Sequence, residues 1–223
     1  VMDFWEPKTV LMLNKASINL LGLLVFLSCD NPESLPYYNT PDFTPLFIDR
    51  PAEVLEKIDH KIENFAVTNQ KEKWVGLDDV KGKVHIANFM FTRCTSICPI
   101  MTNHLKVIAN AFKDEDRFTM LSFSVTPWMD SIPALREFAA RYGIKAKNWH
   151  LLTGNKNEIY SLARRSYFAE KNLGYTKDSS EFLHTEHVVL VDPQLRLRGI
   201  YNATLKTDIL QLQKDIQQLL DEN

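Results

Sequence analysis

The chain has 223 residues, of which 45% are hydrophobic and 24% are charged, and its net charge at pH 7 is -2. This composition is that of a folded globular protein with enough apolar residues for one buried core. A near-neutral chain whose lysines and arginines are scattered lacks the clustered basic surface that binds phosphate groups, so we expect no nucleic-acid partner.

An uncharged, apolar run near the N-terminus is typical of a targeting signal. Ile18–Leu27 is too short to span a bilayer of roughly 30 Å but suits the hydrophobic part of a signal peptide. Lys15 precedes the run and Ser28-Cys29 follows it, an order that resembles a bacterial lipoprotein signal. We therefore expect residues 1–28 to be a signal segment and Cys29 to be lipidated. The alternatives are a plain N-terminal anchor or a buried helix.

Lipidation and a plain anchor have the same consequence for localisation. Either one places the chain in the bacterial cell envelope, anchored to a membrane with its folded domain on the extracytoplasmic side. Residues 29–55 follow the signal and are rich in proline, which fixes φ and removes a hydrogen-bond donor. We expect them to form an extended tether to a domain over residues 56–223. Tyr37, Tyr38 and Phe43 indicate that part of the tether lies against this domain.

Within the domain, apolar patterns predict strands that alternate with helices. The expected strands are residues 62–68, 74–75, 84–91, 118–124, 149–153, 187–191 and 197–201. The expected helices are residues 99–112, which Pro99 opens, 131–142, which Gly143 ends, 156–168 and 207–220. This order predicts an α/β fold with a central mixed sheet flanked by helices, and a thioredoxin-like architecture fits it.

Two cysteines lie where the most apolar strand leads into the first of these helices. Cys94 and Cys98 are separated by three residues, and Pro99 follows them. A thiol at a helix N-terminus faces free N–H groups and the positive end of the helix dipole, which favour the thiolate. Because the thiolate is both the nucleophile and the metal ligand, we expect both cysteines to be redox-active. A structural disulfide or two packed thiols is the alternative.

The spacing of the two cysteines bears on their chemistry. Redox enzymes of this fold usually have two residues between their cysteines, whereas three residues make a wider loop that lets both sulfurs face one ion. Two thiolates are soft ligands that suit Cu(I), with an imidazole as an acceptable third donor. A structural zinc site usually has four ligands, and the sequence offers no second cysteine pair.

Four segments of the chain together resemble the Sco/SenC family. They are LDDVKGKVHIANFMFTRCTSICPIM, SFSVTPWMDSIPALREFAARYG, NWHLLTG and FLHTEHVVLVDP, and the resemblance covers roughly residues 36–220. It implies a thioredoxin-like fold and copper as the cofactor. It also implies a metallochaperone rather than an enzyme, which delivers copper to the binuclear copper centre of cytochrome c oxidase, in subunit II or a similar copper protein.

The same resemblance assigns the ligands residue by residue. It implies that the thiolates of Cys94 and Cys98 and the imidazole of His184 hold the metal. His184 is favoured over His187 because a threonine follows it and because its distance along the chain to Asp192 matches the family. The remaining histidines are expected to be packed or polar residues without a metal: His60, His85, His104 and His150.

The chain departs from the family pattern near the expected site. Thr126 replaces the usual aspartate, and no acidic residue lies between the cysteines. Negative charge close to a thiol disfavours its ionisation. Because this chain has fewer acidic residues near its cysteines than the family pattern has, we expect lower thiol pKa values than in the family.

Two other functions stay open. A thiol–disulfide oxidoreductase would keep a partner's cysteines reduced and would itself need a thiol reductant partner. His184 favours copper over this function, because a reductase needs no distant third ligand. A peroxiredoxin-like peroxidase is disfavoured because Phe91 stands where such sites have threonine, three residues before Cys94.

Overall fold

The fold is taken from a computed structural model of the chain, which describes residues 34–169 and 185–222. The predicted signal segment with Cys29 lies outside the described residues, and so does His184.

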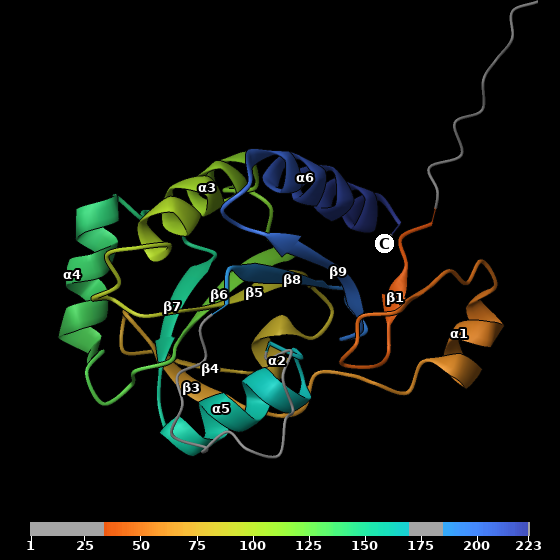
Figure 1. Cartoon of the computed structure of the whole chain (residues 1–223), viewed down its shortest axis with the longest axis horizontal. Coiled ribbons are helices and arrows are strands. Elements are labelled where there is room, and N and C mark those ends of the chain that lie inside the picture. The colour runs from red at the N-terminus through yellow and green to blue at the C-terminus, as the bar shows by residue number, and fades with distance from the viewer. Residues whose placement is uncertain (1–33, 170–184, 223) are drawn as a thin grey trace, which may run out of the picture. The chain divides into compact units, whose positions relative to one another are not determined.

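A mixed β-sheet forms the centre of the described part of the chain (Figure 1), which confirms the predicted α/β fold. The strand order is β2-β1-β9-β8-β5-β6-β7-β3-β4. β5, β6 and β7 are parallel, and the other neighbouring pairs are antiparallel. The strands are β1 (Tyr37–Tyr38), β2 (Pro45–Leu46), β3 (Ala66–Asn69), β4 (Trp74–Gly76), β5 (Val84–Met90), β6 (Phe118–Ser124), β7 (Trp149–Thr153), β8 (His187–Val191) and β9 (Leu197–Asn202).

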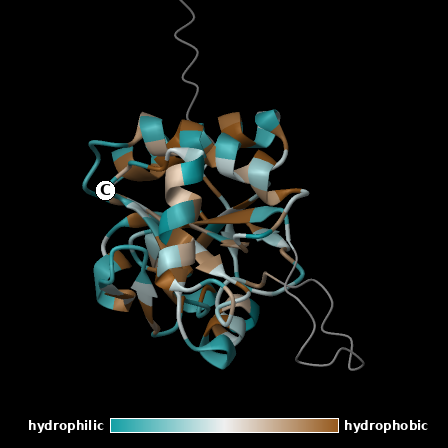
Figure 2. Ribbon diagram, turned by 90° about the vertical axis from the view of Figure 1, so that its left-hand side faces the viewer, coloured by the Kyte–Doolittle hydropathy of each residue, from teal (hydrophilic) through white to brown (hydrophobic). Residues whose placement is uncertain are grey.

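Helices cover both faces of this sheet. They are α1 (Pro51–Lys57), α2 (Leu77–Val80), α3 (Cys98–Ala111), α4 (Ile132–Tyr142), α5 (Lys156–Arg165) and α6 (Lys206–Asp221). α3 and α6 lie on one face, and α2 and α5 lie on the other (Figure 1). Hydrophobic and hydrophilic residues alternate along the helices (Figure 2), as expected for helices with one face against a sheet.

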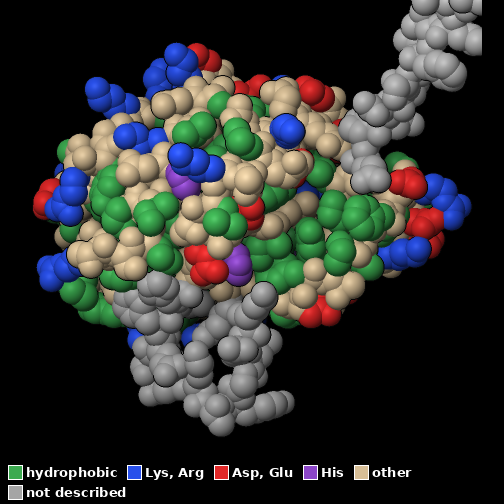
Figure 3. Space-filling model, turned by 45° about the horizontal axis from the view of Figure 1, so that its top comes forward, with side chains coloured by type: hydrophobic (Ala, Val, Ile, Leu, Met, Phe, Trp, Pro, Cys, Tyr) green, Lys and Arg blue, Asp and Glu red, His purple; other side chains and the backbone are tan. Residues whose placement is uncertain are grey.

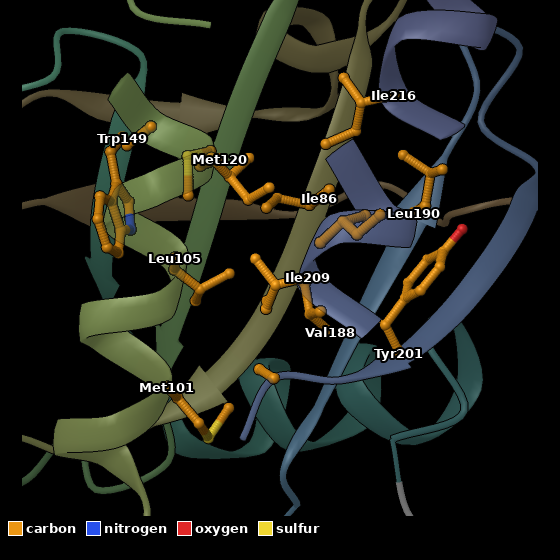
Figure 4. Close-up of a cluster of buried hydrophobic side chains, with 14 of the residues drawn as sticks. Ile86, Met101, Leu105, Met120, Trp149, Val188, Leu190, Tyr201, Ile209 and Ile216 are labelled. Atoms are coloured by element: carbon orange, nitrogen blue, oxygen red, sulfur yellow. The ribbon is translucent and has the colours of Figure 1, made fainter. Parts of the chain in front are cut away.

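The two central strands explain why the sheet is stable. All seven residues of β5 and all seven of β6 are buried, so each strand contributes side chains to both faces. On the face of α3 and α6, Ile86 and Met120 from the strands meet Leu105 and Ile216 from the helices (Figure 4). Burying one such side chain contributes roughly 1.5–3 kcal/mol, so this cluster fixes the position of α3 on the sheet.

Two predicted elements differ from those in the structure by three residues or more at one end, and the other predicted strands and helices differ by at most one residue at either end. The expected strand 62–68 is only β3, which begins at Ala66. Ile62 and Phe65 are buried and mimic a strand pattern, but the N–H of Ile62 donates to the carbonyl of Leu195, outside the sheet. The expected helix 156–168 ends at Arg165, and by Phe168 the backbone has reached a φ of 49°.

The segment around β1 packs against the domain, as its aromatic residues indicated. Tyr38 pairs with Leu197 of β9. The guanidinium of Arg198 lies 4.0 Å from the centre of the Tyr37 ring, and its Nη2 donates to the carbonyl of Leu35 at 2.7 Å. β1, β2, α1 and α2 are short elements that the sequence patterns did not predict.

The surface carries both signs of charge. Lysine and arginine side chains lie among aspartate and glutamate side chains over the face shown in Figure 3. Among the residues that the structure describes, no helix has both the length and the apolar character needed to cross a membrane.

Candidate metal centre

The two cysteines lie at the end of the sheet where the parallel strands stop. β5 ends at Met90, a loop of residues 91–97 follows, and Cys98 is the first residue of α3. The N–H of Val125, just after β6, donates to the carbonyl of Met90 at 2.9 Å, so the loops that leave β5 and β6 start side by side. The carboxyl ends of parallel strands are where α/β proteins usually build their sites.

Both cysteines are free thiols, and both are buried. Residue Cys94 is 7% exposed and residue Cys98 is 3% exposed. The backbone N–H of Cys98 donates to the sulfur of Cys94 over 3.4 Å. Ile97 is the N-cap residue of α3 and has no side chain able to cap it. The sulfur of Cys94 therefore takes the place of a capping oxygen at the N-terminus of this helix.

The two thiols have different pKa values. Burial alone would raise the pKa of Cys94, but hydrogen bonds outweigh it and lower this pKa. They come from the N–H and the thiol of Cys98 and from the N–H groups of Ser96 and Ile97. The pKa of Cys98 is raised, first by burial and then by its thiol–thiol hydrogen bond and by the negative charges of Cys94 and Asp130. Cys94 is thus the thiol that ionises first.

A buried carboxylate joins residues 91–97, the cysteine loop, to residues 125–131, the loop after β6. Asp130 is fully buried and accepts hydrogen bonds from the hydroxyl of Thr92 at 2.6 Å and from its backbone N–H at 3.2 Å. It also accepts from the hydroxyls of Ser124 at 2.6 Å and Thr126 at 3.0 Å. Because Thr92 lies two residues before Cys94, these bonds hold the start of the cysteine loop in place.

The expectation of lower thiol pKa values than in the family stays a prediction. Relative to its ordinary value, the pKa of Cys94 is lowered by hydrogen bonds that outweigh its burial. The pKa of Cys98 is raised from its ordinary value, chiefly by burial, and the carboxylate of Asp130 adds to the shift. Thr126, at the position where aspartate is usual, donates a hydrogen bond to Asp130 and so satisfies that carboxylate.

This polar network was not predicted from the sequence. Its signal was weak: hydroxyl residues at Thr92, Ser124 and Thr126, close to the ends of two strands that are otherwise mostly apolar. Thr92 and Asp130 are 38 residues apart in the chain, so only the adjacency of β5 and β6 brings them together.

The chain enters β8 close to where it leaves β5. In the antiparallel register, Asn88 pairs with Val188, so the start of β8 at His187 lies beside the end of β5. Thr185 is the first described residue before this strand; it is buried, and its hydroxyl accepts a hydrogen bond from the N–H of His187 at 3.1 Å. His184 itself lies outside the described residues.

The other histidines have structural surroundings, as expected. His85 lies 3.2 Å from the hydroxyl of Tyr167, and His104 bonds the carbonyl of Ala203. The ring of His60 stacks on a phenylalanine, and His150 faces an asparagine amide. Within residues 34–169 and 185–222, no three histidine, cysteine or acidic side chains gather closely enough to hold a metal ion. The cysteine pair therefore needs a ligand from elsewhere to make a three-donor site.

The fold, with two free thiols at the start of α3, is that of a thioredoxin-like protein. A sequence model of the SCO1/SenC family matches residues 55–221. This chain belongs to the SCO1/SenC family. A curated relative, the SCO1 protein homolog of Bacillus subtilis (strain 168), is 32% identical over 167 residues, which are 74% of this chain and 86% of the relative.

Solved structures with the same fold include members of this family. A SCO1/SenC family lipoprotein from Bacillus anthracis str. Ames is 29% identical with a TM-score of 0.63, over 73% of this chain and 96% of that one. BsSco, described as having a disulfide switch and as a member of the Sco family of cytochrome c oxidase assembly proteins, is 33% identical with a TM-score of 0.61, over 72% and 93%. ScoI of Bradyrhizobium japonicum, solved with copper bound, shares the fold at 23% identity and a TM-score of 0.56, over 70% and 98%.

Proposed function

We propose that this chain is a copper metallochaperone that holds the metal with the thiolates of Cys94 and Cys98 and the imidazole of His184. The observation that carries the proposal is the hydrogen bond from the Cys98 N–H to the Cys94 sulfur, which brings two free thiols to one helix N-terminus. Two soft thiolates at one place suit Cu(I). Copper bound to ScoI, a protein of the same fold, is in line with this choice.

The register of β5 with β8 supports the proposal that His184 is the third metal ligand. β8 begins beside the end of β5 from which the cysteine loop departs. His184 precedes this strand by three residues in the sequence. An imidazole is an acceptable partner for two thiolates on copper and would leave the ion with three protein ligands.

The copper acceptor that we propose is the binuclear copper centre of cytochrome c oxidase, in subunit II or a similar copper protein. The support is that BsSco, at 33% identity, is named as a cytochrome c oxidase assembly protein. Transfer would proceed by ligand exchange without a change in oxidation state. Bonds from Cu(I) to the two sulfurs of this chain break as bonds to the acceptor's thiolates form, and the acceptor's thiol protons pass to the released thiolates or to water.

A second function, thiol–disulfide exchange, is favoured by the unequal pKa values of the two thiols. The Cys94 thiolate would attack a partner disulfide and release one partner thiolate. Cys98 would then lose its proton and attack the Cys94 sulfur, releasing the second partner thiol and leaving a Cys94–Cys98 disulfide. A thiol reductant would have to reduce this disulfide again. The disulfide switch of BsSco is consistent with such chemistry.

A competition titration of the reduced full-length chain with Cu(I) tests the copper site. Cys94→Ser or Cys98→Ser should abolish tight binding, because one thiolate and one imidazole make a poor soft site. His184→Ala should weaken binding at least tenfold, the effect of losing about 1.4 kcal/mol. The matched control is His187→Ala, which should bind like the wild type. If His187→Ala loses affinity and His184→Ala does not, the proposed ligand set is wrong.

We also propose that the chain is a lipoprotein whose Cys29 carries the lipid, with the domain on the extracytoplasmic side of a bacterial membrane. The order of Lys15, the apolar run and Ser28-Cys29 supports this, and one relative of the same fold is a lipoprotein. Cys29→Ser should block lipid attachment and leave an uncleaved or a released chain. Mass spectrometry that finds an unmodified Cys29 within an intact membrane-bound chain would refute lipidation.

A further inference from the structure

Three large apolar side chains are exposed on the segments around the cysteine pair. Ile100, in the first turn of α3, is 47% exposed. Trp128 and Met129, in the loop between β6 and α4, are 57% and 39% exposed. Most large apolar residues in the described part of the chain are buried, so exposed ones on segments that border a reactive site call for an explanation.

Hydrogen bonds hold the loop of residues 91–97, which leads into α3, against the loop that carries Trp128 and Met129. The carboxylate of Asp130, which directly follows Met129, bonds both the hydroxyl and the N–H of Thr92 in the cysteine loop. Asp130 also lies close enough to Cys98 for its charge to raise the pKa of that thiol. The exposed side chains of the loop after β6 therefore lie on a segment that is hydrogen-bonded to the loop that carries Cys94.

The charges on these segments have one sign at the surface. Residues 91–97 and 125–131 include two charged side chains, Arg93, which is exposed, and Asp130, which is buried and fully engaged with hydroxyl and N–H donors. Within the described part of the chain, Arg93 forms no ion pair. The ammonium group of Lys156 lies 5.0 Å from the centre of the Trp128 ring, which adds a second positive charge beside the apolar residues.

We propose that Arg93, Ile100, Trp128 and Met129 form the docking surface for the copper acceptor, and we call these four residues the docking rim. The occupant that fits the rim is an apolar segment of the acceptor that carries acidic side chains beside its own cysteine pair. This proposal rests on the copper-transfer function proposed above.

Ligand exchange explains why such a surface is needed. Cys94 is 7% exposed and Cys98 is 3% exposed, so acceptor sulfurs reach copper only if the acceptor lies directly against the loop. Apolar side chains supply contact area and exclude water. Arginine and lysine select an acidic partner and speed its approach.

The rim is tested with the copper-loaded full-length chain and synthetic dithiol peptides. The peptides have two cysteines spaced as in this chain and flanked by leucines, and they differ only in carrying glutamate, glutamine or lysine beside them. Stopped-flow measurement gives the second-order rate constant for Cu(I) transfer. The wild type should transfer to the glutamate peptide about tenfold faster than to the lysine peptide at low ionic strength. Arg93→Glu should reverse that order.

Each rim variant has a control that is exposed to a similar extent elsewhere. Ile100→Ser is paired with Val107→Ser on the same helix, where Val107 is 48% exposed. Trp128→Ser is paired with Trp74→Ser on β4, where Trp74 is 74% exposed. Lys113→Glu, beyond the other end of α3, is the control for Arg93→Glu. The rim variants should slow transfer to the glutamate peptide about tenfold, and the controls should transfer like the wild type.

The outcomes separate this proposal from the proposed function. The preference among peptides is a ratio within one variant, so a change in copper affinity does not produce it. If transfer is equal for all peptides, or if controls and rim variants slow equally, the docking rim is wrong while the copper site stands. If rim variants change only the mass of the chain measured by light scattering, the surface serves self-association and the proposal is overturned. If the wild type binds no copper, the proposed function fails. The docking rim is then tested with a different reaction, the reduction of the Cys94–Cys98 disulfide by the same peptides, and the same ratios of rate constants are measured.

Discussion

The two cysteines have the same chemistry but different surroundings. Cys94 accepts a backbone N–H at the start of α3, and its pKa is lowered by hydrogen bonds that outweigh its burial. Cys98 is buried more deeply, and its pKa is raised. A metal ion held by this pair, as proposed above, would meet one thiolate first and would have to displace the proton of the second thiol. Because binding releases that proton, copper affinity should fall as the pH is lowered.

The difference between the thiols predicts which one reacts first. In the reduced chain at neutral pH, iodoacetamide should modify Cys94 well before Cys98, because the thiolate is the reactive form. Cys98→Ala should slow this reaction, since it removes the thiol hydrogen bond that helps to lower the pKa of Cys94. Cys98→Ser keeps a hydroxyl donor and should slow it less. Peptide mapping by mass spectrometry over a range of pH measures both rates, and Cys98 reacting first would contradict this assignment.

At the scale of elements, the site depends on a connection between two loops. β5 and β6 are adjacent parallel strands, and the loops that follow them are joined by the hydrogen bonds between Thr92 and Asp130. The carboxylate is buried, and all its described partners are donors. An asparagine in place of Asp130 has only one accepting oxygen. Its NH₂ group would face hydrogen-bond donors and could not accept from them.

Asp130→Asn should therefore destabilise the domain and loosen the cysteine loop. We expect a loss of about 2–4 kcal/mol in the free energy of unfolding, since a buried network would be left partly unsatisfied. Thr126→Val is the control, because it removes one donor and leaves the other three bonds, and it should cost about 1 kcal/mol. Urea unfolding followed by circular dichroism measures both losses. If the Asp130→Asn variant is as stable as the wild type, the carboxylate does not hold the loops together.

The elements also show what a sequence pattern can predict. β6 was predicted with its observed bounds because large apolar residues recur along it, and the structure buries all seven of its residues. β1 and β2 have two residues each, too few for any pattern, and they exist because the edge of β9 is available for pairing. The cysteine pair could be predicted because its signal is local. The network around Asp130 could not, since it joins residues that only the folded sheet brings together.

At the scale of the whole molecule, a buried histidine makes the stability of the domain depend on pH. His85 lies in the central strand β5, and burial lowers its pKa from 6.5 to about 3, opposed by a backbone hydrogen bond at Lys83. His85 therefore binds a proton less readily in the folded chain than in the unfolded chain. The stability that results from the neutral form of His85 is fully present above pH 6.5 and is lost as the pH falls toward its pKa in the folded chain.

Between pH 7 and pH 5 this one group should lower the free energy of unfolding by about 2 kcal/mol, at about 1.4 kcal/mol per pH unit below the unfolded pKa. His85→Leu cannot titrate, so its stability should decline less over the same range even if it is lower at pH 7. Urea unfolding of both chains at several pH values gives the two slopes. Equal slopes would mean that His85 is not the source of the acid sensitivity.

If one pair of thiolates holds the copper, as proposed, a disulfide between the same cysteines must exclude it. The most direct measurement is a Cu(I) titration of the full-length chain in two states, one fully reduced and one oxidised to the Cys94–Cys98 disulfide, without reductant in the second. We predict one tightly bound copper per reduced chain and no tight binding by the oxidised chain. Copper bound to the oxidised chain with the affinity of the reduced chain would contradict the dithiolate site.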